Sequence, residues 1–234
     1  MEIDDERIKY AVLATEILRA PKQSLYTFGT TNISYFLVTQ PSYSEAKEEG
    51  AETVVREGKV IAERPRIVTP YYLSRLEGFG TEARRYFESL LNEYGPNMAG
   101  VFYTYKNEPK DLNIISDSLP AVVEKINTEI DRRGDTLSAI IRGVDTLWDV
   151  SLLKFIFELT RRSLGDNVQQ MGRRGLLKMD PRGVPADARM RIEDMFRKVS
   201  QGEMEPRELK DELERWELFG EYEDRFFALF GKER

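Results

Sequence analysis

The sequence predicts an α+β fold: a mainly antiparallel sheet with flanking helices, followed by an all-helical C-terminal part. Three observations support this prediction. Several stretches of the first 144 residues are rich in β-branched and aromatic residues, short turns separate most of them, and beyond residue 144 the apolar spacing is helical throughout. We expect an α+β domain over 1–144 and a helical region over 145–234 packed on it, forming either two domains or one continuous domain.

The first expected elements are a helix and a hairpin. A helix is predicted over 6–19, because its apolar residues recur at helical spacing and a proline follows shortly after. These apolar residues are Tyr10, Leu13 and Ile17. The next stretch, SLYTFGTTNISYFLVTQP (24–41), has the composition of strands and is interrupted at 29–32, which predicts a hairpin.

Two more strand pairs are predicted. The stretch ETVVREGKVIAERPRIVTP (52–70) indicates a hairpin that turns at Glu57–Gly58, and Pro65 favours an edge strand or a bulge. The stretches GVFYTYK and DLNIIS flank the turn NEPK and indicate the third pair. Because short turns join these strands, we expect antiparallel pairing.

Helix signals are clear at six places. One helix is expected between Thr81, as its N-cap, and Gly95; another is expected over 119–133, with a proline in its first turn and Gly134 closing it. The remaining helices are expected over 146–164, 187–199, 206–218 and 221–230.

The composition excludes several chemistries. The chain contains no cysteine and no histidine, which removes disulfides, thiolate nucleophiles, zinc–thiolate sites and imidazole bases. No recognised catalytic motif is present, so the sequence leans toward a protein that is not an enzyme, and no cofactor is predicted. No apolar run approaches the roughly 18 residues that span a bilayer, and the acidic start does not resemble a secretion signal. We therefore expect a cytoplasmic protein without membrane contact.

An arginine- and glycine-rich stretch, GDNVQQMGRRGLLKMDPRG (165–183), is the main candidate for binding. Residues 151–200 carry 11 basic and 6 acidic side chains, whereas 201–234 carry 6 basic and 11 acidic ones. The basic segment therefore faces either a polyanion or its own acidic neighbour. In the second case the glycines end helices and 180–183 forms a β-turn. The candidate anion-binding residues are Arg161, Arg162, Arg173, Arg174, Lys178 and Arg182.

Two smaller patterns allow alternative interpretations. Asp145 and Asp149 lie four residues apart, so one helix face can present both carboxylates to a divalent ion; alternatively, Asp145 is the N-cap of the following helix and Asp149 lies near its positive end. Tyr103 and Tyr105 share one face of a strand, where they either stack on bases or lie in the core beneath a helix, such as that over 119–133.

Three hypotheses for function follow. The first is a non-enzymatic binding or scaffold protein whose arginine-rich surface contacts a nucleic acid or an acidic protein partner. The second is a carboxylate- and divalent-metal-dependent enzyme on a phosphorylated substrate, with ligands from Asp111, Asp117, Asp145 and Asp149. The third is a structural homo-oligomer, with a C-terminal aromatic helix that contacts a partner chain through Phe219, Tyr222, Phe226, Phe227 and Phe230.

Overall fold

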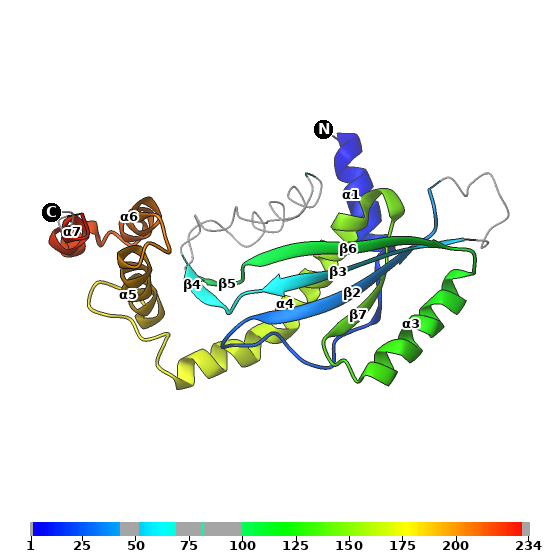
Figure 1. Ribbon diagram of the computed structural model, residues 1–234, viewed down its shortest axis with the longest axis horizontal. Coiled ribbons are helices and arrows are strands. Elements are labelled where there is room, and N and C mark those ends of the chain that lie inside the picture. Colours follow the sequence, from blue (N-terminus) through cyan, green and yellow to red (C-terminus); the bar gives the residue numbers. More distant parts are fainter. Residues whose placement is uncertain (1, 43–51, 69–80, 82–99, 231–234) are drawn as a thin grey trace. The chain divides into compact units, whose positions relative to one another are not determined.

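A computed structural model describes residues 2–42, 52–68, 81 and 100–230 of the chain (Figure 1). The chain forms two compact units. The first unit comprises Met1–Pro65, Ser74–Pro96 and Tyr103–Asn167, and the second comprises Arg66–Leu73, Asn97–Phe102 and Val168–Arg234. The helix expected after Thr81 lies outside the described residues.

A five-stranded mixed sheet forms the centre of the first unit, with the strand order β1-β7-β2-β3-β6. Strands β2 and β7 run parallel, whereas the pairs β1–β7, β2–β3 and β3–β6 are antiparallel. The α+β class and the mainly antiparallel sheet are therefore confirmed. The strands are β1 (Glu16–Arg19), β2 (Thr31–Thr39), β3 (Thr53–Ala62), β6 (Tyr105–Ile115) and β7 (Ser138–Arg142).

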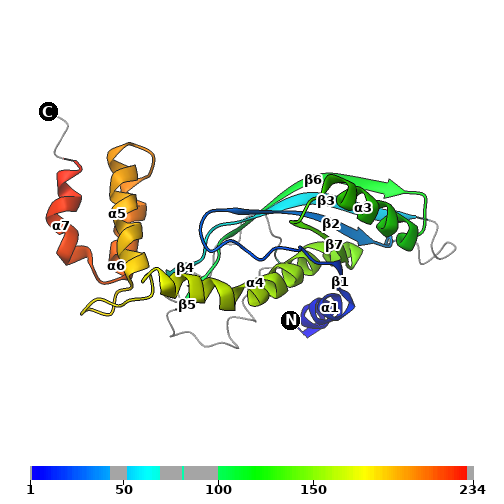
Figure 2. The same cartoon turned by 90° about the horizontal axis from the view of Figure 1, so that it is seen from below.

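Helices cover both faces of this sheet. Figure 2 shows the sheet between α3 (Leu119–Arg133) on one side and α4 (Trp148–Arg173) on the other. Helix α3 was predicted with these bounds, and Gly134 closes it in the left-handed conformation at φ 66°. Its buried residues Val122 and Ile130 pack against Val38, Val55 and Ile140 of three strands. This apolar core covers only one end of the sheet face.

The sheet-facing side of α4 carries polar groups that hydrogen-bond to the strands and loops beneath it. The Asn167 amide donates to Tyr103 Oη at 2.6 Å, and the Thr160 hydroxyl bonds to that of Tyr105. The Ser163 hydroxyl accepts from the Leu25 backbone N–H at 3.0 Å. The tyrosines are therefore in the core, and α4 rather than the helix over 119–133 covers them.

The N-terminal helix begins and ends earlier in the chain than predicted. Helix α1 (Glu2–Ala14) ends before residues that pair with β7 as strand β1, so extension of the sheet replaces the last helical turn. The expected apolar stripe is also wrong, because Tyr10 and Leu13 are exposed while Ile8 and Ala11 are buried against the start of α4. The hairpin expected over 24–41 has only its second strand, β2.

Two expected turns lie inside continuous strands. Glu57–Gly58 is the middle of β3, and NEPK is the middle of β6, where the two strands pair across a bulge. Gly58 is needed for close approach: a Cβ there would lie 2.6 Å from Cζ of Tyr35 and 2.8 Å from the Glu108 carbonyl oxygen. Pro109 is tolerated because β6 is the edge strand of the sheet.

The second unit combines a two-stranded sheet with helices. Strands β4 (Arg66–Val68) and β5 (Gly100–Phe102) pair antiparallel, and the last residues of α4 belong to this unit. Helices were correctly expected here, and their bounds are α5 (Ala186–Ser200), α6 (Pro206–Arg215) and α7 (Phe219–Ala228). Their core includes Ile192, Phe196, Leu209, Leu213 and Phe226.

Candidate functional site

The arginine-rich residues are divided between the two units. Arg161 and Arg162 are exposed on the part of α4 that belongs to the first unit, where Arg162 donates to the Pro21 carbonyl at 2.8 Å. The other four candidates are exposed in the second unit. These are Arg173, Arg174, Lys178 and Arg182. Helix α4 continues through Gly165 to Arg173, so the first half of the stretch is helical and only 174–185 connects two helices.

The acidic C-terminal segment pairs with part of the basic one. Glu221 of α7 contacts Arg182 at 3.1 Å and Arg189 at 2.7 Å, and Arg189 also contacts Asp180 at 2.6 Å. The expected β-turn over 180–183 is present, since the Gly183 N–H donates to the Asp180 carbonyl at 2.9 Å. Backbone hydrogen bonding from Val184, together with Arg189, lowers the pKa of the Asp180 carboxyl.

Asp145, one of the two aspartates predicted to share a divalent ion, is engaged with protein side chains instead. Asp145 lies in the short 3₁₀ helix η3 (Asp145–Leu147), and its carboxylate contacts Arg56 at 2.8 Å and Thr39 Oγ1 at 3.0 Å. The prediction that Asp145 is the N-cap of the following helix is therefore wrong, because its carboxylate forms an ion pair with the half-buried Arg56 instead. Burial raises the pKa of Asp145, but these hydrogen bonds outweigh burial and lower it. Across the described residues, no three acidic side chains group closely enough to hold a metal ion.

The C-terminal aromatic residues are partly used inside the second unit. Phe226 is buried, and Phe219 and Tyr222 pack against the same core. Phe227 and Phe230 are 57% and 51% exposed, and both form edge contacts with the Phe226 ring. Two of the five residues predicted to contact a partner chain therefore remain at the surface.

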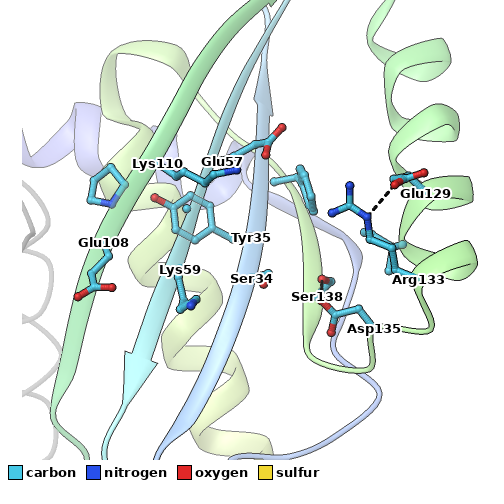
Figure 3. A pocket seen from close by; sticks show the side chains of 14 residues that line it. Ser34, Tyr35, Glu57, Lys59, Glu108, Lys110, Glu129, Arg133, Asp135 and Ser138 are labelled. Carbon is cyan, nitrogen blue, oxygen red and sulfur yellow. Dashed lines mark hydrogen bonds and ion pairs between the residues drawn. The ribbon is translucent and has the colours of Figure 1, made fainter.

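A polar pocket on the α3 face of the sheet was not predicted from the sequence (Figure 3). It has a volume of about 360 Å³ and lies beside the last turn of α3, within the first unit. Its charged lining residues are Glu57, Lys59, Glu108, Lys110, Glu129, Arg133 and Asp135, and Ser34 and Ser138 contribute hydroxyl groups. Figure 3 shows these side chains projecting from both the strands and α3.

The strand register brings these residues together. Ser34 of β2 pairs with Ser138 of β7 on one side and with Lys59 of β3 on the other, and Lys59 pairs with Glu108 of β6. Because residues directly opposite one another share a face, these four side chains form one polar row across four strands. Further along the same face the residues are apolar and α3 packs on them. The pocket thus begins where the face changes from apolar to polar.

Two pocket carboxylates, Glu108 and Glu129, have lowered pKa values. Hydrogen bonds from Arg132 and Arg133 lower the pKa of Glu129 to about 2, and a hydrogen bond from Lys106 lowers that of Glu108. Asp135 accepts from Ser138 Oγ at 2.6 Å and from the Leu137 N–H at 2.8 Å. Glu108 and Glu129 are therefore suited to binding by charge and hydrogen bonds rather than to donating protons at neutral pH.

Comparisons with known proteins give no relative. No family model matches the sequence, and searches of the curated proteins and of the solved structures found no match. Function must therefore be inferred from the residues of this chain. Among the helices of the described residues, none is long and apolar enough to cross a membrane.

Proposed function

We propose that the protein is a non-enzymatic binding protein that takes a small polar molecule into the pocket between the sheet and α3. The supporting observation is convergence: charged and hydroxyl side chains from β2, β3, β6, β7 and α3 line one hollow of about 360 Å³. This volume lies within the range of roughly 300–1,000 Å³ that is usual for ligand pockets. Such a pocket orients a ligand through a few placed polar groups.

The chemistry of the lining favours binding over catalysis. The chain has no imidazole or thiol, and the lowered pKa values of Glu108 and Glu129 keep both residues as anions near neutral pH. A general acid needs a raised pKa instead. The groups in the pocket therefore supply fixed charges and hydrogen-bond partners.

The proposal is tested by thermal shift and calorimetry with four defined probe sets: amino acids, dicarboxylic acids, sugar phosphates and polyamines. We expect one set to raise the unfolding temperature of the wild type. The Ser34→Phe variant fills the pocket floor and should remove this rise, whereas Ser200→Phe, at an exposed serine of α5, should keep it. No response to any set, or equal responses in both variants, would refute the proposal.

A second candidate function is the binding of a nucleic acid or an acidic protein by the arginine-rich surface. It is favoured by one observation: four exposed cations lie within ten residues of the second unit, at Arg173, Arg174, Lys178 and Arg182. Electrophoretic shifts with single-stranded and duplex DNA test this function at ~50 and ~200 mM salt, because phosphate contacts lose affinity steeply over that range.

Matched variants make this second test specific. The double variant Arg173→Gln/Lys178→Gln removes two exposed cations, and Arg197→Gln/Lys198→Gln removes two that pair with Asp194 on α5. We expect the first variant to lose more DNA affinity than the second. Equal losses, or no DNA shift by the wild type at ~50 mM salt, would reject nucleic acid as the partner.

A further inference from the structure

The charged groups of the pocket differ in how fully the protein already satisfies them. Glu129 accepts from Arg132 and Arg133 at 2.7 Å each, and Glu108 contacts Lys106 at 2.8 Å. Asp135 accepts from Ser138 Oγ and from a backbone N–H. Each of these carboxylates already has a cationic partner or a hydrogen-bond donor within the protein. A ligand therefore gains little binding free energy by contacting them.

Glu57 and Lys59 are different. Both side chains line the pocket from β3, and neither lies within ion-pair distance of another described residue, although the charge of Lys59 contributes to lowering the pKa of Glu108. Strand side chains alternate between faces, so these two project to the same face, with Cα atoms about 7 Å apart along the strand. One carboxylate and one ammonium therefore belong to the lining of the same hollow.

Arg133 adds a second cation to this arrangement. Its Nε donates to Glu129 at 2.7 Å, and this is its ion pair on α3. Figure 3 shows the guanidinium group extending from α3 toward the strands, so its terminal nitrogens face the hollow. A guanidinium fixed by one hydrogen bond retains donors for a ligand carboxylate.

The charge balance of the whole lining is nearly even. Four carboxylates (Glu57, Glu108, Glu129 and Asp135) and three cations (Lys59, Lys110 and Arg133) line the pocket. A polyanion would meet four like charges and a polycation three. A molecule with one charge of each sign and no net charge meets the least repulsion.

We infer that the pocket binds a small zwitterion of the amino-acid type, with its ammonium group at Glu57 and its carboxylate at Lys59 and Arg133. This inference rests on the proposed function of the pocket. The volume of about 360 Å³ is large enough for such a molecule. The Ser138 hydroxyl donates to Asp135, so its oxygen offers the ligand an acceptor.

The inference is tested with the twenty standard amino acids as probes, by thermal shift and then by calorimetry on the strongest. That amino acid is compared with its N-acetyl derivative, which lacks the ammonium charge, and with its amide, which lacks the carboxylate. We expect each derivative to bind the wild type at least about tenfold more weakly, as is usual for loss of a charged hydrogen bond.

Two variants assign each ligand group to its residue. In Glu57→Gln the penalty for N-acetylation should largely disappear, and in Lys59→Gln the penalty for amidation should fall. The controls Glu124→Gln and Lys9→Gln change exposed charges outside the pocket and should leave both penalties unchanged. This pattern depends on the ligand charge, so a merely structural effect of a variant would not produce it.

The outcomes separate the inference from the proposed function. If dicarboxylic acids or sugar phosphates bind and Ser34→Phe blocks them while no amino acid binds, the zwitterion inference is overturned and the pocket function stands. The zwitterion inference is also overturned, and the pocket function also stands, if an amino acid binds but Glu57→Gln and Lys59→Gln leave unchanged the affinity losses caused by N-acetylation and amidation. If no polar probe binds the wild type, both fall.

Discussion

Removing the acid of one buried ion pair should destabilise the second unit strongly. Glu212 is 0% exposed and Arg191 is 5% exposed. Arg191 Nε donates to Glu212 Oε1 at 2.8 Å, and Trp216 Nε1 donates to the same oxygen at 3.0 Å. Arg191 also donates to the Ile67 carbonyl of β4 at 3.3 Å, so the pair joins this strand to α5 and α6.

The magnitude follows from the burial of both charges. Glu212→Leu leaves the Arg191 guanidinium buried without its carboxylate, and breaking such a pair costs about 3–5 kcal/mol. The double variant Arg191→Met/Glu212→Leu removes both charges together, and it should recover most of this loss. With a urea m value of about 1.5 kcal/mol per M, the single variant should unfold at about 2–3 M lower urea.

The two tryptophans allow the units to be followed separately. Trp148 belongs to the first unit and Trp216 to the second. In a Trp148→Phe background, fluorescence reports the unfolding of the second unit alone as urea is increased. A midpoint shift below about 0.5 M for Glu212→Leu, or a double variant as unstable as the single one, would contradict the reasoning.

Three further predictions follow from local geometry. Gly58→Ala should lower the free energy of unfolding of the first unit by about 1–3 kcal/mol, because the added Cβ would clash with the Tyr35 ring. The loss is measured by Trp148 fluorescence in urea, and an unchanged urea midpoint would refute the close contact. Glu129 has a folded pKa of about 2 against an ordinary 4.5, so it stabilises the fold above pH 4.5 and this contribution is lost as pH falls toward 2. Glu129→Gln should therefore flatten the pH dependence of the urea midpoint in that window, and an identical slope would count against the ion pairs. If the exposed aromatic face holds a second chain, Phe227→Ser/Phe230→Ser should lower the mass seen by light scattering, and an unchanged mass would exclude that interface.

Elements with complete local signals were predicted well. Helix α3 has a proline in its first turn, an apolar stripe and a closing glycine, and the structure has it at the predicted residues. Strand β7 was not predicted, because its five residues are mostly buried in the middle of the sheet and show no polar alternation. Gly58 was misassigned to a turn, since a glycine needed for close packing looks the same in a sequence.

The pocket could not be predicted because its residues are distant in the chain. Ser34, Lys59 and Ser138 become neighbours only through the strand register, which no local pattern specifies. A weaker signal was present in β3, where the charged residues Glu57 and Lys59 recur at the two-residue spacing of one strand face. The ion pair between Arg182 and Glu221 of the acidic C-terminal segment likewise depends on the tertiary structure, so it could not be predicted from the charge counts of the two segments.

The most direct test of the pocket is a backbone amide NMR map of the protein with an equimolar pool of the twenty amino acids. The proposed function and the zwitterion inference together predict that the largest shift changes cluster at Ser34, Gly58, Lys59 and Ser138, around the polar row of the α3 face. Changes confined to other surfaces, such as the connection 174–185 between α4 and α5, would contradict both.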